Sequence, residues 1–153
     1  MDEKLEDVVK KAKDFLIQNK LCVISTVSLT GKPESAVCIY MSNENFDFYF
    51  VTRQQTRKFE NLKNNKNVAI VVGTVAAPET IQIEGEVELV SGKKNEFIET
   101  LVGRADLEEL YYGPFLLTKG ANFAIFKVKI KWLRYLHLNL KTFKEEYHQI
   151  IPS

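Results

Sequence analysis

The stretch FDFYFVTRQQTRK, residues 46–58, decides the fold because its hydrophobic period changes partway along. Its three phenylalanines alternate with other side chains, which is the period of a strand with one aromatic face. From Thr52 the pattern becomes helical. Thr52 and Gln55 have the spacing of a capping box, so the sequence predicts a helix with Thr52 as its N-cap. A strand is therefore expected to lead directly into a short helix.

Strand-like segments lie on both sides of this junction. Residues 81–89 alternate apolar with polar or acidic side chains, and the skip at Gly85 predicts a bulge or kink. Short turns join neighbouring segments, which favours an antiparallel sheet, and closing that sheet would remove its edges. We expect a mainly β, α+β fold: a small barrel of about six strands with flanking helices. The other strand segments are 21–29, 34–42, 68–75 and 126–132.

Helical spacing of apolar residues predicts helices outside the barrel. The first runs over residues 5–16, with Asp2 as a plausible N-cap and an end near Asn19. A second helical pattern, in two pieces, covers residues 92–111. No repeat or linker divides the sequence, so residues 1–153 are expected to form a single domain.

Composition excludes several classes of protein. The 21 Lys and Arg against 20 Asp and Glu give a net charge of +1, whereas a dedicated nucleic-acid-binding domain has a marked basic excess. The longest nearly apolar run, residues 68–77, is half of the roughly 20 residues that span a bilayer. The acidic N-terminus does not resemble a signal peptide. We expect a soluble, cytoplasmic protein without a nucleic-acid or membrane partner.

Residues for metal or nucleophilic chemistry are scarce. His137 and His148, the two histidines, have no partner at metal-ligand spacing, so no metal site is expected. No GxSxG motif is present. Cys22 and Cys38 lie in apolar strand segments without a CxxC motif, so they are expected to be buried, reduced and dispensable for function, with a redox pair as the alternative.

Charged side chains alternate on two of the predicted strands. One strand carries an acidic face and another a basic face, and opposite charges on paired strands stabilise a sheet. We therefore expect these faces to be neighbours rather than to form a nucleic-acid groove. The acidic residues are Glu84, Glu86 and Glu88, and the basic residues are Lys127, Lys129 and Lys131.

The strand–helix junction is also the best candidate binding site. It combines the hydroxyls of Thr52 and Thr56 with the cations of Arg53, Arg57 and Lys58. A helix N-terminus offers free N–H groups and a positive dipole end, which favour a phosphate. Helical spacing places Arg53, Thr56 and Arg57 on one face. The alternative is a solvated helix start whose cations point into water.

The order of these segments resembles the FMN-binding split-barrel family related to pyridoxamine 5'-phosphate oxidase. The resemblance covers roughly residues 10–135. It implies an antiparallel split β-barrel with flanking helices and a flavin at the two-fold interface of a homodimer. The matching segments are a first helix, a strand pair around TGKPESA, then FDFYFVT, TRK, NLKNNKNVAIVV and IQIEGEVELV.

The resemblance also implies cofactor-binding residues. Positions at the end of the strand and in the Ser/Thr-Arg-Lys triplet hold the flavin phosphate, and a polar position before the glycine strand contacts the flavin. The corresponding residues here are Val51, Thr52, Thr56, Arg57, Lys58 and Thr80.

Departures from the oxidases in this family bear on the reaction. Those oxidases have an Arg and a Lys on the strand that matches residues 36–41, where this sequence has no cation. They have Gln at the position of Thr80 and a C-terminal Arg/His substrate segment without a counterpart here. Pyridoxal phosphate synthesis is therefore doubtful.

Two functions remain open. The first is an FMN-dependent oxidoreductase or reductase that acts on an unidentified small molecule, with the flavin ring performing the redox step. The second is a non-enzymatic protein of the same fold that binds flavin or haem for storage or sensing. No catalytic residue can be named. Tyr111, Tyr112 and Trp132 are candidates for stacking on a ring, or else for the core or the dimer interface.

Overall fold

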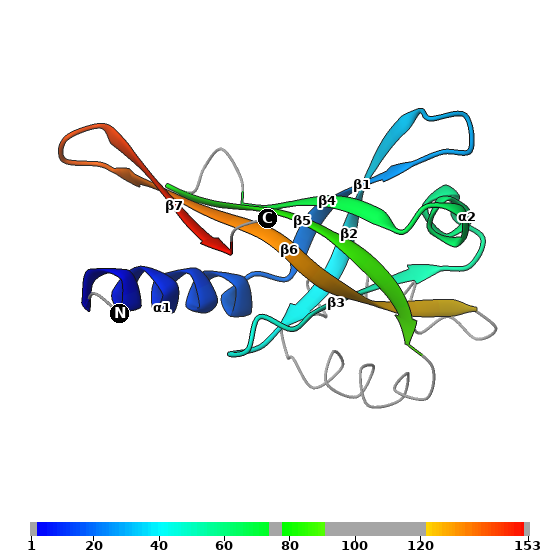
Figure 1. Ribbon diagram of the computed structural model, residues 1–153, viewed down its shortest axis with the longest axis horizontal. Coiled ribbons are helices and arrows are strands. Elements are labelled where there is room, and N and C mark those ends of the chain that lie inside the picture. The colour runs from blue at the N-terminus through cyan, green and yellow to red at the C-terminus, as the bar shows by residue number, and fades with distance from the viewer. Residues whose placement is uncertain (1–2, 74–77, 91–121, 152–153) are drawn as a thin grey trace.

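The computed structural model describes residues 3–73, 78–90 and 122–151 (Figure 1). The predicted N-cap Asp2, the helical pattern over 92–111 and the aromatic pair Tyr111 and Tyr112 lie outside these residues. The described elements, in chain order, are α1 (Glu3–Gln18), β1 (Leu21–Val27), β2 (Pro33–Ser42), β3 (Phe48–Arg53), α2 (Arg57–Asn64), β4 (Asn67–Val72), β5 (Glu79–Val90), β6 (Phe123–Asn139) and β7 (Lys144–Ile151).

Six strands form a closed antiparallel barrel in the order β3-β2-β1-β4-β5-β6, and the pairing of β3 with β6 closes it. The predicted split-barrel fold with about six strands and flanking helices is confirmed. The long β6 continues beyond the barrel and pairs with β7 to form a projecting hairpin (Figure 1). β7 was not predicted from the sequence, because most of its side chains are exposed and its sequence does not alternate.

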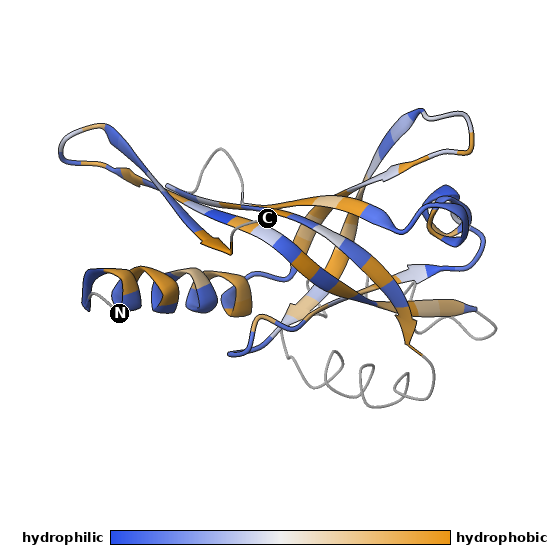
Figure 2. Ribbon diagram, viewed as in Figure 1, coloured by the Kyte–Doolittle hydropathy of each residue, from blue (hydrophilic) through white to orange (hydrophobic). Residues whose placement is uncertain are grey.

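The barrel core is built from the predicted aromatic face of β3. Phe48 and Phe50 are fully buried, and the Phe48 ring stacks on Tyr40 of β2 with centroids 4.5 Å apart. Burial of each such ring stabilises the fold by about 1.5–3 kcal/mol. The Tyr40 hydroxyl donates a 2.7 Å hydrogen bond to the carbonyl of Leu16, which fixes the end of α1 against the barrel. Figure 2 shows the underlying alternation as bands of opposite hydropathy along α1 and the strands.

The predicted bulge lies at Gly85, between β5 and β6. Glu84 pairs with Trp132 but Gly85 pairs with Ile130, so β6 has one extra residue there. A Cβ on Gly85 would lie 2.5 Å from the carbonyl oxygen of Lys129, a distance that only glycine avoids. Close approach of the two backbones therefore requires glycine at this position.

The predicted neighbouring of acidic and basic faces is also confirmed. Glu86 pairs with Lys129 and Glu88 with Lys127 in the β5–β6 register, and Lys131 makes an ion pair with Glu86. The hydrogen bond from Lys131 lowers the pKa of the Glu86 carboxyl. These paired charges therefore stabilise the β5–β6 sheet.

Cys22 and Cys38 are free, buried and directly opposite each other in the β1–β2 register, as expected for reduced core thiols. Burial raises the pKa of both thiols, that of Cys38 to about 11. Both thiols are therefore protonated near neutral pH and behave as small apolar side chains.

This burial predicts a loss of stability at alkaline pH. Unfolded thiols titrate near pH 8.5, so from there to about pH 11 the unfolded chain loses a proton that native Cys38 keeps. The unfolded state then binds fewer protons, and the free energy of unfolding falls with rising pH by up to about 1.4 kcal/mol per pH unit for each thiol. Urea unfolding under reducing conditions measures this, at about pH 8 and about pH 10. A Cys22→Ala/Cys38→Ala variant should lose less stability than the wild type, and an equal loss would contradict the assignment.

Candidate anion-binding site

The chain turns from β3 into α2 through residues 54–56. Here the structure corrects the predicted helix start: α2 begins at Arg57, its N-cap is Thr56, and Thr52 belongs to β3. The Thr56 hydroxyl accepts a 3.3 Å hydrogen bond from the Phe59 N–H. The predicted capping box at Thr52 and Gln55 is therefore wrong.

Strand pairing explains the later helix start. Thr52 pairs with Ala124 and Arg53 with Phe123 on β6, and the Gln54 N–H donates a 3.0 Å hydrogen bond to the Asn122 carbonyl. These bonds keep the backbone extended where the local sequence would permit a helix. Arg53 consequently ends β3, and the predicted helix face shared by Arg53, Thr56 and Arg57 does not exist.

The two threonine hydroxyls of the junction contact each other. The Oγ1 atoms of Thr52 and Thr56 are 2.9 Å apart, and that of Thr56 also donates to the Arg53 carbonyl at 2.9 Å. Thr52 is buried, with 4% of its surface exposed. Its hydroxyl thus supports the turn that presents Thr56, Arg57 and Lys58.

A pocket of about 160 Å³ opens beside the start of α2. It lies between this helix and the inner faces of β1 and β2, and its volume suits a phosphate-sized group rather than a three-ring flavin. The lining residues are Thr26, Glu34, Ser35, Ala36, Thr56, Arg57 and Lys58. Three of the six residues predicted to bind the cofactor therefore lie in one pocket.

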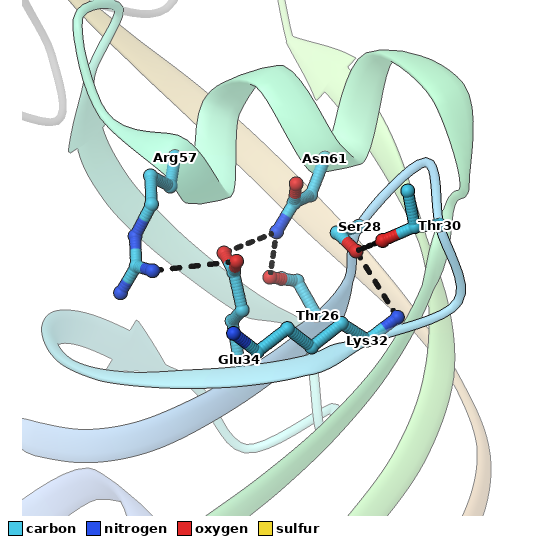
Figure 3. Close-up of polar contacts among 7 residues, drawn as sticks. All are labelled: Thr26, Ser28, Thr30, Lys32, Glu34, Arg57 and Asn61. Carbon is cyan, nitrogen blue, oxygen red and sulfur yellow. Dashed lines mark hydrogen bonds and ion pairs between the residues drawn. The ribbon is translucent and has the colours of Figure 1, made fainter.

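A hydrogen-bond network closes one side of this pocket (Figure 3). Glu34 Oε1 accepts from Arg57 Nη1 at 3.3 Å, and Glu34 Oε2 accepts from Asn61 Nδ2 at 3.0 Å. The same Asn61 nitrogen also donates to Thr26 Oγ1 at 2.9 Å. Thr26, Glu34 and Asn61 were not predicted from the sequence as site residues. Only the spacing of Asn61, one helical turn after Arg57, could have indicated it.

Lys58 differs from Arg57 because it has no ion-pair partner within the described part of the chain. Its charge acts on the thiols of Cys22 and Cys38, whose raised pKa values it partly offsets. Lys58 lines the same pocket as Arg57. Of the two pocket cations, Lys58 is the one left available to an anion.

The structure does not bring the other predicted residues into the pocket. Val51 is buried in a separate apolar cluster with Ile39 and Ile125. Thr80 pairs with Leu136, whereas Thr52 pairs with Ala124. Those two partners are 12 residues apart on β6, roughly 40 Å measured along a strand. Thr80 thus lies far from the pocket along the sheet.

Two absences within the described part of the chain bear on the possible chemistry. Within residues 3–73, 78–90 and 122–151, no group of three or more His, Cys, Asp or Glu side chains could hold a metal ion. No helix in these ranges is long and apolar enough to cross a membrane. What the site offers is two cations, a hydroxyl and a helix N-terminus.

This chain is similar to known proteins in sequence and in fold. A family model described as pyridoxamine 5'-phosphate oxidase matches residues 8–137. A pyridoxine/pyridoxamine 5'-phosphate oxidase from Janthinobacterium sp. (strain Marseille) is 29% identical over 73 residues, 48% of this chain and 35% of that protein. The aligned segment therefore spans about a third of the length of that curated relative.

Solved structures show the same fold in proteins with different ligands. A Nostoc punctiforme protein described as pyridoxamine 5'-phosphate oxidase-related and FMN binding has a TM-score of 0.60 at 13% identity, over 98% of this chain and 96% of that one. The haem storage protein HutZ from Vibrio cholerae has a TM-score of 0.62 at 18% identity, over 81% of this chain and 91% of that one. At these identities the likeness concerns the fold alone.

The network around Asn61 predicts a stability effect. Asn61→Ala leaves the buried Thr26 hydroxyl and the Glu34 carboxylate without their shared donor, which costs about 1–3 kcal/mol. Asn64, on the same helix, is the matched control because its exposed amide donates only to the carbonyl of Glu60. Urea unfolding should show a change within about 0.5 kcal/mol for Asn64→Ala. Equal effects of the two substitutions would disprove the role given to Asn61.

Proposed function

The chain belongs to the pyridoxamine 5'-phosphate oxidase family, and we propose that it binds FMN with the flavin phosphate in the pocket at the start of α2. The observation that carries this proposal is the convergence of Arg57, Lys58 and the Thr56 hydroxyl on one small pocket. Charge-assisted hydrogen bonds of this kind are about twice as strong as neutral ones.

The residues present fit a phosphate. The first N–H groups of α2 have no partner within the helix, and the helix dipole adds positive potential at the same place. Val51 and Thr52 support the junction from β3 and do not line the pocket. We assign phosphate binding to Arg57 and Lys58. Thr56 would join them if its hydroxyl proton turned from the Arg53 carbonyl to the phosphate, and Thr52 supports Thr56.

The proposed activity is that of a flavin-dependent oxidoreductase on a small molecule. The bound flavin would supply the redox chemistry, and this chain would supply placement and charge. Ala36 lines the pocket on β2, the strand where the resemblance implies cations in the oxidases. Its methyl group adds no charge for a phosphorylated substrate, which supports a reaction other than pyridoxal phosphate synthesis.

Haem binding is the competing function within this fold. Haem iron in proteins is held by His, Cys, Met or Tyr side chains, and the residues that line this pocket include none of them. The pocket chemistry therefore favours a phosphorylated ligand. A visible spectrum of the purified protein distinguishes flavin absorption from a haem Soret band.

Loss of either pocket cation should weaken FMN binding selectively. A charge-assisted hydrogen bond contributes about 1.5–3 kcal/mol, so Arg57→Ala and Lys58→Ala should each weaken FMN binding by roughly ten- to a hundredfold. Riboflavin lacks the phosphate, so its affinity should hardly change. Titration of each variant with both flavins, followed by flavin fluorescence, measures the difference.

The matched control for this experiment is Lys63→Ala. Lys63 is in the last turn of the same helix, where it is exposed and paired with Glu60. The Lys63→Ala substitution removes one positive charge, as the pocket substitutions do, but should leave the preference for FMN over riboflavin unchanged. If folded Arg57→Ala and Lys58→Ala variants keep the wild-type preference for FMN over riboflavin, the phosphate site is elsewhere.

We also propose a homodimer, for which the outer face of the barrel offers a surface. Val37, Val23 and Val71 lie side by side across β2, β1 and β4 and are 46%, 41% and 38% exposed. A contiguous apolar surface of this kind is typical of a protein interface. A dimer would also allow Thr80 of one protomer to approach a flavin held by Thr56–Lys58 of its partner.

A substitution in this patch tests the dimer. Val23→Lys places a charge at its centre and should shift the mass measured by light scattering from dimer toward monomer. Leu29→Lys is the control, because Leu29 is 75% exposed in the β1–β2 turn outside the patch. A monomeric wild type at micromolar concentration would refute the dimer, and with it an interfacial flavin site.

A further inference from the structure

We propose that Glu34 sets the phosphate preference of the pocket by competing with the ligand for Arg57. This inference rests on the proposed function, since it concerns the same site. It assigns to Glu34 the role of a specificity residue that limits affinity for a doubly charged phosphate. This role depends on which partner of the Glu34–Arg57 ion pair is held in place.

The two partners of the Glu34–Arg57 ion pair differ in burial. The Glu34 side chain is 16% exposed, whereas that of Arg57 is 77% exposed. Glu34 is therefore the buried partner and Arg57 the exposed one. Figure 3 shows the Glu34 carboxylate between the side chains of Arg57 and Asn61. An anion that enters the pocket meets the carboxylate and the guanidinium together.

Asn61 prevents the carboxylate from moving aside. Its amide is buried, with 6% of the residue exposed, and it donates to Glu34 Oε2 and to Thr26 Oγ1. A rotation of Glu34 away from the pocket would leave this buried donor with one acceptor fewer. The carboxylate therefore stays in place, and Arg57 is the partner that must divide its hydrogen bonds between Glu34 and a phosphate.

The charge balance gives the direction of the effect. Arg57 and Lys58 contribute two positive charges and Glu34 removes one, so the pocket has a net charge of +1. A phosphate monoester carries about −1.5 to −2 near neutral pH. Neutralising Glu34 should therefore strengthen the binding of FMN and leave uncharged riboflavin nearly unaffected. A purely structural ion pair would instead change stability without changing the ratio of the two affinities.

The test is a titration of Glu34→Gln with FMN and with riboflavin. Glutamine has the same shape and keeps one oxygen for Asn61, so the network can persist. We expect FMN to bind about three- to fivefold more tightly, on the scale of one exposed charge interaction, and riboflavin to change by less than about twofold. Should Glu34→Gln fail to fold, as judged by circular dichroism, Glu34→Ala removes the same charge and is expected to give the same gain.

Glu60→Gln is the matched control. Glu60 is exposed on α2, pairs with Lys63 and does not line the pocket, and its substitution changes the net charge by the same amount. It should leave both flavin affinities unchanged. An equal gain in FMN affinity for Glu60→Gln and Glu34→Gln would reduce the effect to net charge and overturn the inference.

The remaining outcomes separate this inference from the proposed function. If the wild type prefers FMN, and Lys58→Ala abolishes that preference while Glu34→Gln produces no gain, the phosphate site stands and the role of Glu34 is wrong. If the wild type binds neither flavin, the proposed function fails and this inference fails with it. Weaker FMN binding by Glu34→Gln would show that Glu34 orients Arg57 for the phosphate, which also overturns the competition.

Discussion

The pairing of β3 with both β2 and β6 is the constraint on which the rest of the structure depends. It closes the barrel and buries the aromatic face of the strand, with Phe48 and Phe50 fully enclosed. The same pairing continues through Arg53 to the hydrogen bond between Gln54 and Asn122, so the chain stays extended to the rim of the barrel. Only there can it turn, and α2 therefore begins at Arg57. The position of the pocket therefore depends on the residue at which the pairing of β3 with β6 ends.

Within that frame, a buried amide links the fold to the charge of the pocket. Asn61 lies on α2, yet its partners Thr26 and Glu34 lie on β1 and β2. An unpaired buried amide is costly, so the network fixes the distance between the helix and the strand pair. That distance also brings a carboxylate within hydrogen-bond reach of Arg57. The contact that stabilises the helix thus determines the electrostatic balance of the site.

The sequence predicts those features that local pattern controls. The alternation of phenylalanines over residues 46–50 predicted the inner face of β3, and the skip at Gly85 predicted the bulge because only glycine permits the close approach of β6. The start of α2 was predicted wrongly, since a capping pattern at Thr52 cannot reveal that β6 holds the same residues in a sheet. Glu34 was missed because its partners are 23 and 27 residues away. Partners of that kind become visible only once the strands are in register.

The pocket therefore has two halves, one on α2 that matches the family pattern and one on β2 that departs from it. The half on α2, with Thr56, Arg57 and Lys58, matches the pattern of the family, as the resemblance to its flavin-binding members implies. The half on β2 departs from it: Ala36 and Glu34 line the pocket on the strand where the family's oxidases have cations. The absence of a cation at Ala36 leaves the fold intact, because Ala36 and Glu34 lie at the pocket rather than in the barrel core. Under the proposed function, the residues of α2 hold the phosphate while Glu34 on β2 adjusts how strongly it is held.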